Sequence, residues 1–165
     1  PETLVVQFDA HLDCYDLHDT ATELSHGNWM RHANPRPSVV NVASRDLFLT
    51  ANSVAETFAS VHAIDAIAAN TGAVAADLRE RVARADRVWI DIDADAFDPA
   101  FAPGVSHPSP FGLTPPQFLF LFEACWSDKV AGVSISEFDP GRDVRDATLN
   151  LLGWLTERIL LRKFE

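Results

Sequence analysis

The stretch 4–13, Leu-Val-Val-Gln-Phe-Asp-Ala-His-Leu-Asp, joins an apolar, strand-like run to three potential metal ligands at the point where that run ends. The ligands are Asp9, His11 and Asp13. They are spaced two residues apart, so an extended backbone would point all three side chains to one side. Taken alone, the triplet also fits a turn with capping aspartates and a hydrogen-bonded histidine.

A second acidic cluster at 91–95, Asp-Ile-Asp-Ala-Asp, follows another strand-like run at 88–90 and favours the metal site. Three carboxylates on one face of an extended segment repel one another unless a cation or protons compensate. Mixed carboxylate and imidazole ligation suits manganese or zinc, and the excess of aspartate over histidine favours manganese. A carboxylate-rich site that holds two metal ions about 4 Å apart indicates hydrolysis. Asp98 precedes Pro99 and is interpreted as a turn or capping residue.

Composition restricts the partners of the chain. Its 165 residues, 47% of them hydrophobic, suffice for one globular domain with its own core. The net charge of −11 argues against a nucleic acid or an anionic membrane as partner and is compatible with a cationic substrate. No apolar run reaches the roughly 18 residues that span a bilayer. We therefore expect a cytoplasmic protein in which Cys14 and Cys125 are reduced thiols.

Strand-like and helix-like segments alternate along the chain. The nearly continuous apolar runs 4–8, 39–42, 88–92 and 130–135 predict parallel strands that are covered on both faces. Helices are predicted at 73–85, from Thr114-Pro115-Pro116 onward, and at 143–164. Residues 58–68 fit either a strand or a helix end, and we favour the strand. The predicted buried positions of the last two helices are Phe118, Leu121, Phe122 and Cys125, and then Leu149, Leu152, Leu155, Ile159 and Leu160.

Four segments, in this order, resemble the successive signatures of the ureohydrolase family of arginases, agmatinases and formiminoglutamases. They are 9–13 (Asp-Ala-His-Leu-Asp), 25–27 (Ser-His-Gly), 93–99 (Asp-Ala-Asp-Ala-Phe-Asp-Pro) and 136–140 (Ser-Glu-Phe-Asp-Pro). The resemblance implies a doubly wound, mostly parallel α/β fold with helices on both faces. It also implies a homotrimer or homohexamer and two Mn2+ ions whose bridging hydroxide hydrolyses a guanidino or formimino compound, releasing urea or an amide.

The same resemblance assigns roles to individual residues. It places Asp9, His11, Asp13, Asp93 and Asp95 in the metal-ligand positions. It prefers the last two aspartates over Asp91, whose role it leaves open. His26 matches the proton-shuttle histidine, and imidazole is suited to act as a general acid near neutral pH. Glu137 matches the carboxylate that holds the guanidinium group, which carries several N–H donors in one plane.

Departures from the family pattern lead to further expectations. The family has a Gly-Gly-Asp-His segment upstream that supplies one more ligand histidine, and nothing here matches it. We therefore expect a domain truncated at its N-terminus, with strands missing and one metal short of a ligand. The other histidines, His18, His32, His62 and His107, are predicted to be surface or core residues. Tyr15 stands where arginases have an Asn that binds the amino-acid head group, which favours an agmatinase-like substrate over L-arginine.

Two other hypotheses stay open. The chain would be an inactive or metal-binding structural remnant of the family if the absent histidine has abolished catalysis. A deacetylase of related fold is a weaker alternative, because the Ser-His-Gly and Glu-Phe-Asp-Pro segments favour guanidino chemistry.

Overall fold

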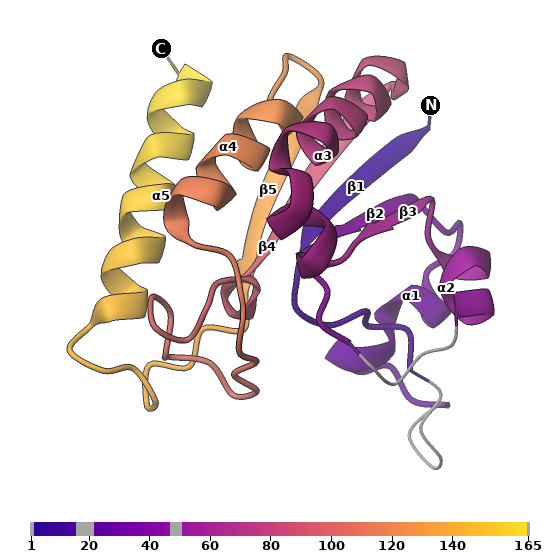
Figure 1. Cartoon of the computed structure of the whole chain (residues 1–165). Coiled ribbons are helices and arrows are strands. Elements are labelled where there is room, and N and C mark those ends of the chain that lie inside the picture. Colours follow the sequence, from indigo (N-terminus) through magenta and orange to yellow (C-terminus); the bar gives the residue numbers. More distant parts are fainter. Residues whose placement is uncertain (1, 16–21, 47–50, 165) are drawn as a thin grey trace.

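The computed structural model describes residues 2–15, 22–46 and 51–164, which form a five-stranded, fully parallel sheet with helices on both faces (Figure 1). The strands are β1 (Thr3–Phe8), β2 (Ser38–Val42), β3 (Ser60–His62), β4 (Arg87–Asp93) and β5 (Val130–Ser136). The helices are η2 (His26–Asn28), α1 (Trp29–His32), α2 (Ala51–Thr57), α3 (Ile64–Arg84), η3 (Ala94–Ala96), α4 (Pro115–Cys125) and α5 (Ala147–Phe164). The predicted parallel α/β fold is confirmed.

The strands lie side by side in the order β3-β2-β1-β4-β5, so the direction in which successive strands are added to the sheet reverses between β1 and β4. The chain steps outward from β1 to β3 and then crosses back to place β4 on the other side of β1. Phe8 and Ile92 are paired in the register, so β1 and β4 end side by side. Ligands of open α/β sheets bind outside the carboxyl ends of the strands at such a reversal. Both acidic clusters therefore emerge at the point of the sheet most suited to a site.

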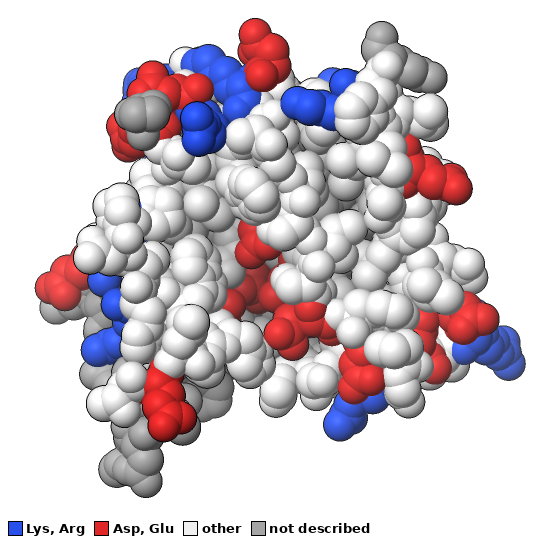
Figure 2. All heavy atoms as spheres, turned by 180° about the vertical axis from the view of Figure 1, so that it is seen from behind, with Lys and Arg blue, Asp and Glu red and all other residues white. Residues whose placement is uncertain are grey.

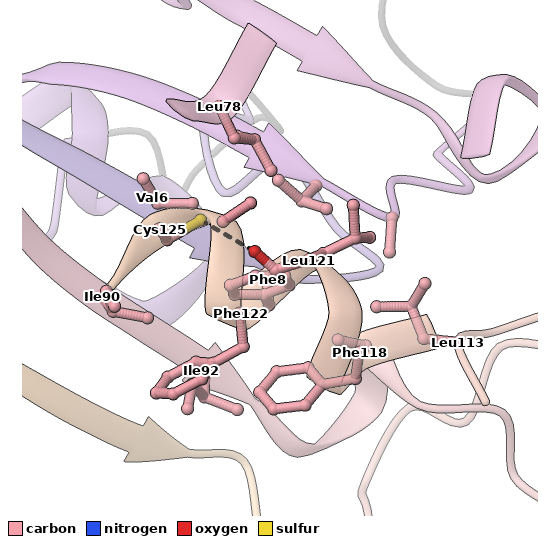
Figure 3. Packing of buried hydrophobic residues seen from close by; sticks show 14 of the residues in the cluster. Val6, Phe8, Leu78, Ile90, Ile92, Leu113, Phe118, Leu121, Phe122 and Cys125 are labelled. Carbon is pink, nitrogen blue, oxygen red and sulfur yellow. Dashed lines mark hydrogen bonds between the residues drawn. The ribbon is translucent and has the colours of Figure 1, made fainter. Parts of the chain in front are cut away.

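A large apolar layer covers one face of the sheet, and a smaller layer covers β1, β2 and β3 on the other face. The prediction that all strands are covered on both faces is wrong for β4 and β5, because the smaller layer does not reach them and Trp89 is 40% exposed. Val6 and Phe8 face α3, α4 and α5, whereas Val5 faces the smaller layer that includes α1 and α2. Figure 3 shows the larger layer, in which α4 presents Phe118 and Phe122 to the sheet. The centroid of the Phe118 ring lies 4.9 Å from that of Phe8. Burial on both sides explains why the β1 sequence is continuously apolar and does not alternate.

Helix α3 is longer than the helix predicted at 73–85. It begins at Ile64 and continues to Arg84, with a kink at Asn70, whose backbone is not helical. Asn70 Oδ1 accepts a hydrogen bond from Ala73 N at 3.0 Å, which caps the second half of the helix. The predicted helix at 73–85 is that second half. The strand favoured at 58–68 is present only as β3, because the helix begins two residues after it.

The last two helices test the predicted buried stripes. The stripe of α4 is confirmed, and Thr114 caps this helix as expected. In α5 the prediction is right for Leu152 and Leu155 but wrong for Leu149 and Leu160, which are each 51% exposed. The helix begins at Ala147 and not at 143, because Asp143 lies before it and accepts hydrogen bonds from two backbone N–H groups of its first turn.

The structure also bears on the two cysteines and on the absence of a long apolar run. Cys14 and Cys125 are both buried free thiols. Within the described ranges, no helix combines the length and the apolar character needed to cross a membrane.

Candidate metal centre

All five predicted metal ligands lie together at the carboxyl ends of β1 and β4. They form two groups that share Asp9. The first contains Asp9, His11 and Asp95, and the second contains Asp9, Asp13 and Asp93; within each group the ligand atoms lie within 4.8 Å of one another. A carboxylate has two oxygens and can serve two neighbouring cations. The arrangement therefore fits two adjacent metal positions bridged by Asp9.

The backbone brings these ligands together by tight turns and not by the extended geometry expected from the sequence. Asp13 has a left-handed backbone with φ of 46°, and Asp95 lies in the short helix η3 after β4 has ended. Asp9 Oδ1 accepts a hydrogen bond from His11 N at 2.7 Å. Asp95 Oδ1 accepts one from Ala10 N at 3.3 Å, which ties the two ligand turns to each other.

Burial makes the carboxylates of this cluster reluctant to ionise. It raises the pKa of Asp93 to about 9, and repulsion from Asp95 and Glu137 adds to this. Burial also raises the pKa of Asp13 to about 7, against the opposing influence of His11 and nearby His26. The pKa of Asp9 is raised well above its ordinary value, by burial first and then by Asp93. Without a cation, the cluster holds protons that an exposed aspartate would have lost.

The donor set fits a metal ion such as manganese. Within the described residues, Asp93 Oδ1 is buried without a hydrogen-bond partner, so this oxygen is available to a cation. The hydrogen bond between His11 Nδ1 and Asp95 Oδ2, at 3.1 Å, raises the pKa of His11 and links two members of one ligand group. Four carboxylates and one imidazole form the mixed oxygen and nitrogen set that suits manganese or zinc.

The cluster lies at the wall of a cavity of about 570 Å3. His26 and Glu137, which the sequence predicted to be catalytic, line the same cavity. Figure 2 shows acidic side chains gathered in a hollow near the middle of this face of the molecule. His26 Nδ1 lies 3.1 Å from Glu137 Oε1, although the two residues are 111 positions apart in the sequence. His26 is largely exposed at the cavity, whereas the side chain of Glu137 is only 23% exposed. Glu137 also has a left-handed backbone with φ of 59°, a conformation that proteins often retain at functional sites.

Tyr15 forms another wall of the cavity. Its hydroxyl donates to Asp46, and its backbone N–H donates to Gly27 O at 3.0 Å. Its ring lies so near Gly27 that a Cβ added there would be 3.3 Å from the ring. Burial and the hydrogen bond to Asp46 raise the pKa of Tyr15, which keeps the phenol neutral. This wall is consequently aromatic and uncharged.

The remaining sequence predictions have mixed outcomes. Asp98 is the turn residue that was expected, because its carboxylate accepts hydrogen bonds from Ala100 N and Gly112 N. Asp91 lies outside both ligand groups and accepts a hydrogen bond from Ser134. Two histidines lie away from the cluster, as predicted: His32 is exposed at the end of α1, and His62 pairs with Asp77 of α3. His18 lies outside the described residues.

His107 is exposed, which agrees with its prediction as a surface or core residue, but its position at the cavity wall was not predicted. Its ring centroid lies 6.4 Å from that of His11 and 6.2 Å from that of His26. The available signal was its position in the long loop after β4, at the edge of the sheet where the ligands gather. Gln7 was also missed: it is buried within β1, and its Nε2 donates to Asp9 Oδ2 at 2.8 Å. A polar residue inside an apolar strand was the signal for Gln7.

Comparison with known proteins identifies the family of the chain. The sequence model of the arginase family matches residues 1–161. An agmatinase from Proteus mirabilis is 29% identical over 147 residues, and a formimidoylglutamase from Macrococcus caseolyticus is 42% identical over 69 residues. A solved structure of a T. brucei arginase-like protein, a triple mutant bound with Mn2+, superposes with a TM-score of 0.75 at 25% identity. The chain therefore belongs to the arginase family.

The matched regions differ in extent. The agmatinase alignment covers 87% of this chain, the formimidoylglutamase alignment 41%, and the T. brucei structure 99%. In the other direction, the chain spans 46% of the agmatinase, 22% of the formimidoylglutamase and 53% of the T. brucei chain. The chain thus corresponds to about half, or less, of each of these proteins.

Proposed function

We propose that the protein hydrolyses a guanidino or formimino compound with the help of two Mn2+ ions, releasing urea or an amide. The observation that carries this proposal is the joint position of the two ligand groups and the pair of His26 and Glu137 on one cavity. Membership of the arginase family and the Mn2+-bound T. brucei relative support it.

Each part of the cavity has a chemical task in this proposal. Bound Mn2+ supplies Lewis acidity, which makes water a competent nucleophile at neutral pH. The two ions would be held by the two ligand groups, which contain Asp9, His11, Asp13, Asp93 and Asp95. Glu137 accepts hydrogen bonds from the planar cationic end of the substrate and fixes its orientation. His26 lies next to that carboxylate and delivers a proton to the nitrogen that leaves, so the departing group is a neutral amine.

The cavity favours a substrate other than L-arginine. Tyr15 packs on Gly27 and uses its hydroxyl on Asp46, so it forms an uncharged wall where an amino-acid head group would need polar partners. Agmatine, which lacks the α-carboxylate of L-arginine, makes a smaller demand for polar partners at that wall. The matches to an agmatinase and a formimidoylglutamase are compatible with this choice, and an agmatinase-like substrate is the one we favour.

Other features of the proposed enzyme come from the family resemblance and the composition. We propose a single domain that assembles into homotrimers or homohexamers and functions in the cytoplasm.

The direct test is turnover by the Mn2+-loaded protein of a panel containing agmatine, 4-guanidinobutyrate, N-formimino-L-glutamate and L-arginine. We expect urea or formamide from at least one of the first three, at a higher kcat/KM than for L-arginine. Glu137→Gln should lower kcat/KM by roughly 10- to 100-fold, because a hydrogen bond to a charged group is lost. Glu157→Gln, which alters an exposed carboxylate of α5, is the matched control.

A Mn2+-loaded protein that releases no product from any member of the panel would contradict the proposal. That result would favour the alternative of a metal-binding structural remnant of the family.

A further inference from the structure

The segment that follows β2 has no part in the proposed chemistry, yet it contacts both ligand turns. Arg45 is half-buried in this segment, and its guanidinium donates to four backbone carbonyls. Nη2 donates to Asp95 O and Ser109 O, each at 2.8 Å, and Nη1 donates to Ala43 O and Ala96 O, each at 3.2 Å. One side chain thus holds its own loop, the turn that carries Asp95, and the loop that leads to α4.

The backbone of Arg45 reaches the other ligand turn. Its N–H donates to Ala10 O at 2.9 Å, and Ala10 lies between the ligands Asp9 and His11. Asn41, at the end of β2, adds a hydrogen bond from Nδ2 to His11 O at 2.9 Å. The carboxyl end of β2 therefore supports both halves of the metal cluster from one side.

The charge of Arg45 and its shape would affect metal binding in opposite directions. A cation near Asp9 and Asp95 offsets the repulsion between the carboxylates, but it also repels an incoming Mn2+. The planar guanidinium, in contrast, offers several N–H donors in a fixed geometry, which a lysine ammonium cannot reproduce. If charge alone mattered, removing Arg45 would strengthen Mn2+ binding; if the hydrogen bonds matter, removing it would weaken binding.

We propose that Arg45 is a positioning residue: its four hydrogen bonds to backbone carbonyls fix the turn that carries Asp95 and the loop that contains Ser109. Mn2+ affinity therefore depends on the guanidinium group of Arg45 and not only on its charge. The inference rests on the metal binding in the proposed function and not on the identity of the substrate. Arg45 touches neither the ligand side-chain oxygens nor the reacting groups; it acts by holding the backbone that presents them.

The test is Mn2+ affinity, measured from the free Mn2+ signal in electron paramagnetic resonance titrations of the purified chain, Arg45→Lys and Arg45→Met. We expect both variants to bind about 10- to 100-fold more weakly, as is typical when a group that supports metal ligands is lost. Arg45→Lys keeps the charge, so weaker binding by this variant assigns the effect to the hydrogen-bonding geometry. Arg81→Lys, which alters an arginine paired with Asp77 in α3, is the matched control and should bind as the unaltered protein does.

Loss of stability is separated from loss of positioning by Leu155→Ala, a core substitution in α5. This variant should unfold at a lower temperature yet bind Mn2+ normally at temperatures where it is folded. Unchanged or tighter binding by the Arg45 variants would overturn the inference while leaving the proposed function intact. No Mn2+ binding by the unaltered chain would contradict both.

Discussion

At the scale of single residues, the metal cluster places charges where the protein environment does not favour them. Asp93 is almost fully buried, and its pKa is raised to about 9 by burial and by neighbouring carboxylates. Such a group weakens the metal-free protein at neutral pH and becomes useful once a cation neutralises it. Function and metal-free stability thus make opposite demands on the same side chain.

Asp93→Asn separates these two demands. The amide has nearly the shape of the carboxylate and no charge, so the metal-free variant should melt at a higher temperature than the unaltered protein at pH 8. The same variant should bind Mn2+ at least 10-fold more weakly, because an anionic ligand is lost. Thermal unfolding and Mn2+ titration measure the two effects. Asp128→Asn, at an exposed loop position, should change neither, and a lower melting temperature with unchanged Mn2+ affinity for Asp93→Asn would contradict the account.

The sequence predicted which residues gather at the cluster but not how the backbone gathers them. The spacing of Asp9, His11 and Asp13 predicted an extended segment, whereas Asp13 has a left-handed backbone. Which residues can bind a metal follows from the chemistry of their side chains, and the sequence gives the side chains directly. The turn depends on hydrogen bonds from distant segments, such as that between Ala10 and Asp95, which no local pattern encodes. His107 was missed for the same reason, since only the fold places its loop beside His26.

At the scale of elements, the loop between β4 and α4 fixes the turn that carries Asp95. Leu113 N donates to Ala96 O at 2.9 Å, directly after the ligand turn. Gly112 allows this approach, because a Cβ added there would lie 2.3 Å from Asp98 N and 2.4 Å from the carbonyl carbon of Phe97. These contacts are with backbone atoms, which cannot move aside as a flexible side chain would.

Gly112→Ala should therefore lower both stability and Mn2+ affinity, because the added methyl group displaces the backbone next to the ligand turn. Gly153→Ala is a matched control, since an added Cβ meets nothing within 4 Å in α5. Glycine within a helix costs roughly 0.5–1 kcal/mol relative to alanine, so Gly153→Ala should stabilise the protein by about that amount. Urea unfolding and Mn2+ titration measure the effects. Normal stability and Mn2+ affinity in Gly112→Ala would show that the loop does not control the ligand turn.

The elements themselves were predictable to different degrees. The positions of the strands were predicted well, because each contains an apolar run that the sequence shows directly. Burial on both faces is observed for β1 and β2, whereas Trp89 of β4 is 40% exposed and β5 is only partly buried. The start of α3 was missed because Asn70 interrupts it and the first half carries a weaker pattern. Leu149 was predicted to be buried because leucines recur along α5, but the structure places only one stripe of the helix against the core.

At the scale of the whole molecule, the raised pKa values predict how the stability of the metal-free protein depends on pH. The folded form keeps protons on Asp13 and Asp93 up to about pH 7 and pH 9, whereas the unfolded chain loses them near the ordinary value of 3.8. The folded state thus binds more protons in this range, and the free energy of unfolding falls as pH rises from 5 to 9. His11, whose pKa is raised by its hydrogen bond to Asp95, contributes in the same direction.

Bound Mn2+ should remove most of this pH dependence, because the ions replace the protons as partners of the carboxylates. Melting temperatures of the metal-free and Mn2+-loaded protein between pH 5 and pH 9 provide the measurement. We expect the gap between the two forms to widen with pH. A metal-free protein that becomes more stable from pH 5 to pH 9 would show that the cluster is not a buried set of protonated carboxylates.

The central claim is that the ends of β1 and β4 form one metal centre in which Asp9 belongs to both ligand groups. The most direct measurement is an equilibrium titration with Mn2+ of the unaltered protein, Asp9→Asn and Asp128→Asn, with bound metal counted by elemental analysis. We expect the unaltered protein and Asp128→Asn to bind two Mn2+ and Asp9→Asn to lose both, because Asp9 belongs to both ligand groups. Undiminished Mn2+ binding by Asp9→Asn, or no binding by the unaltered protein, would contradict the claim.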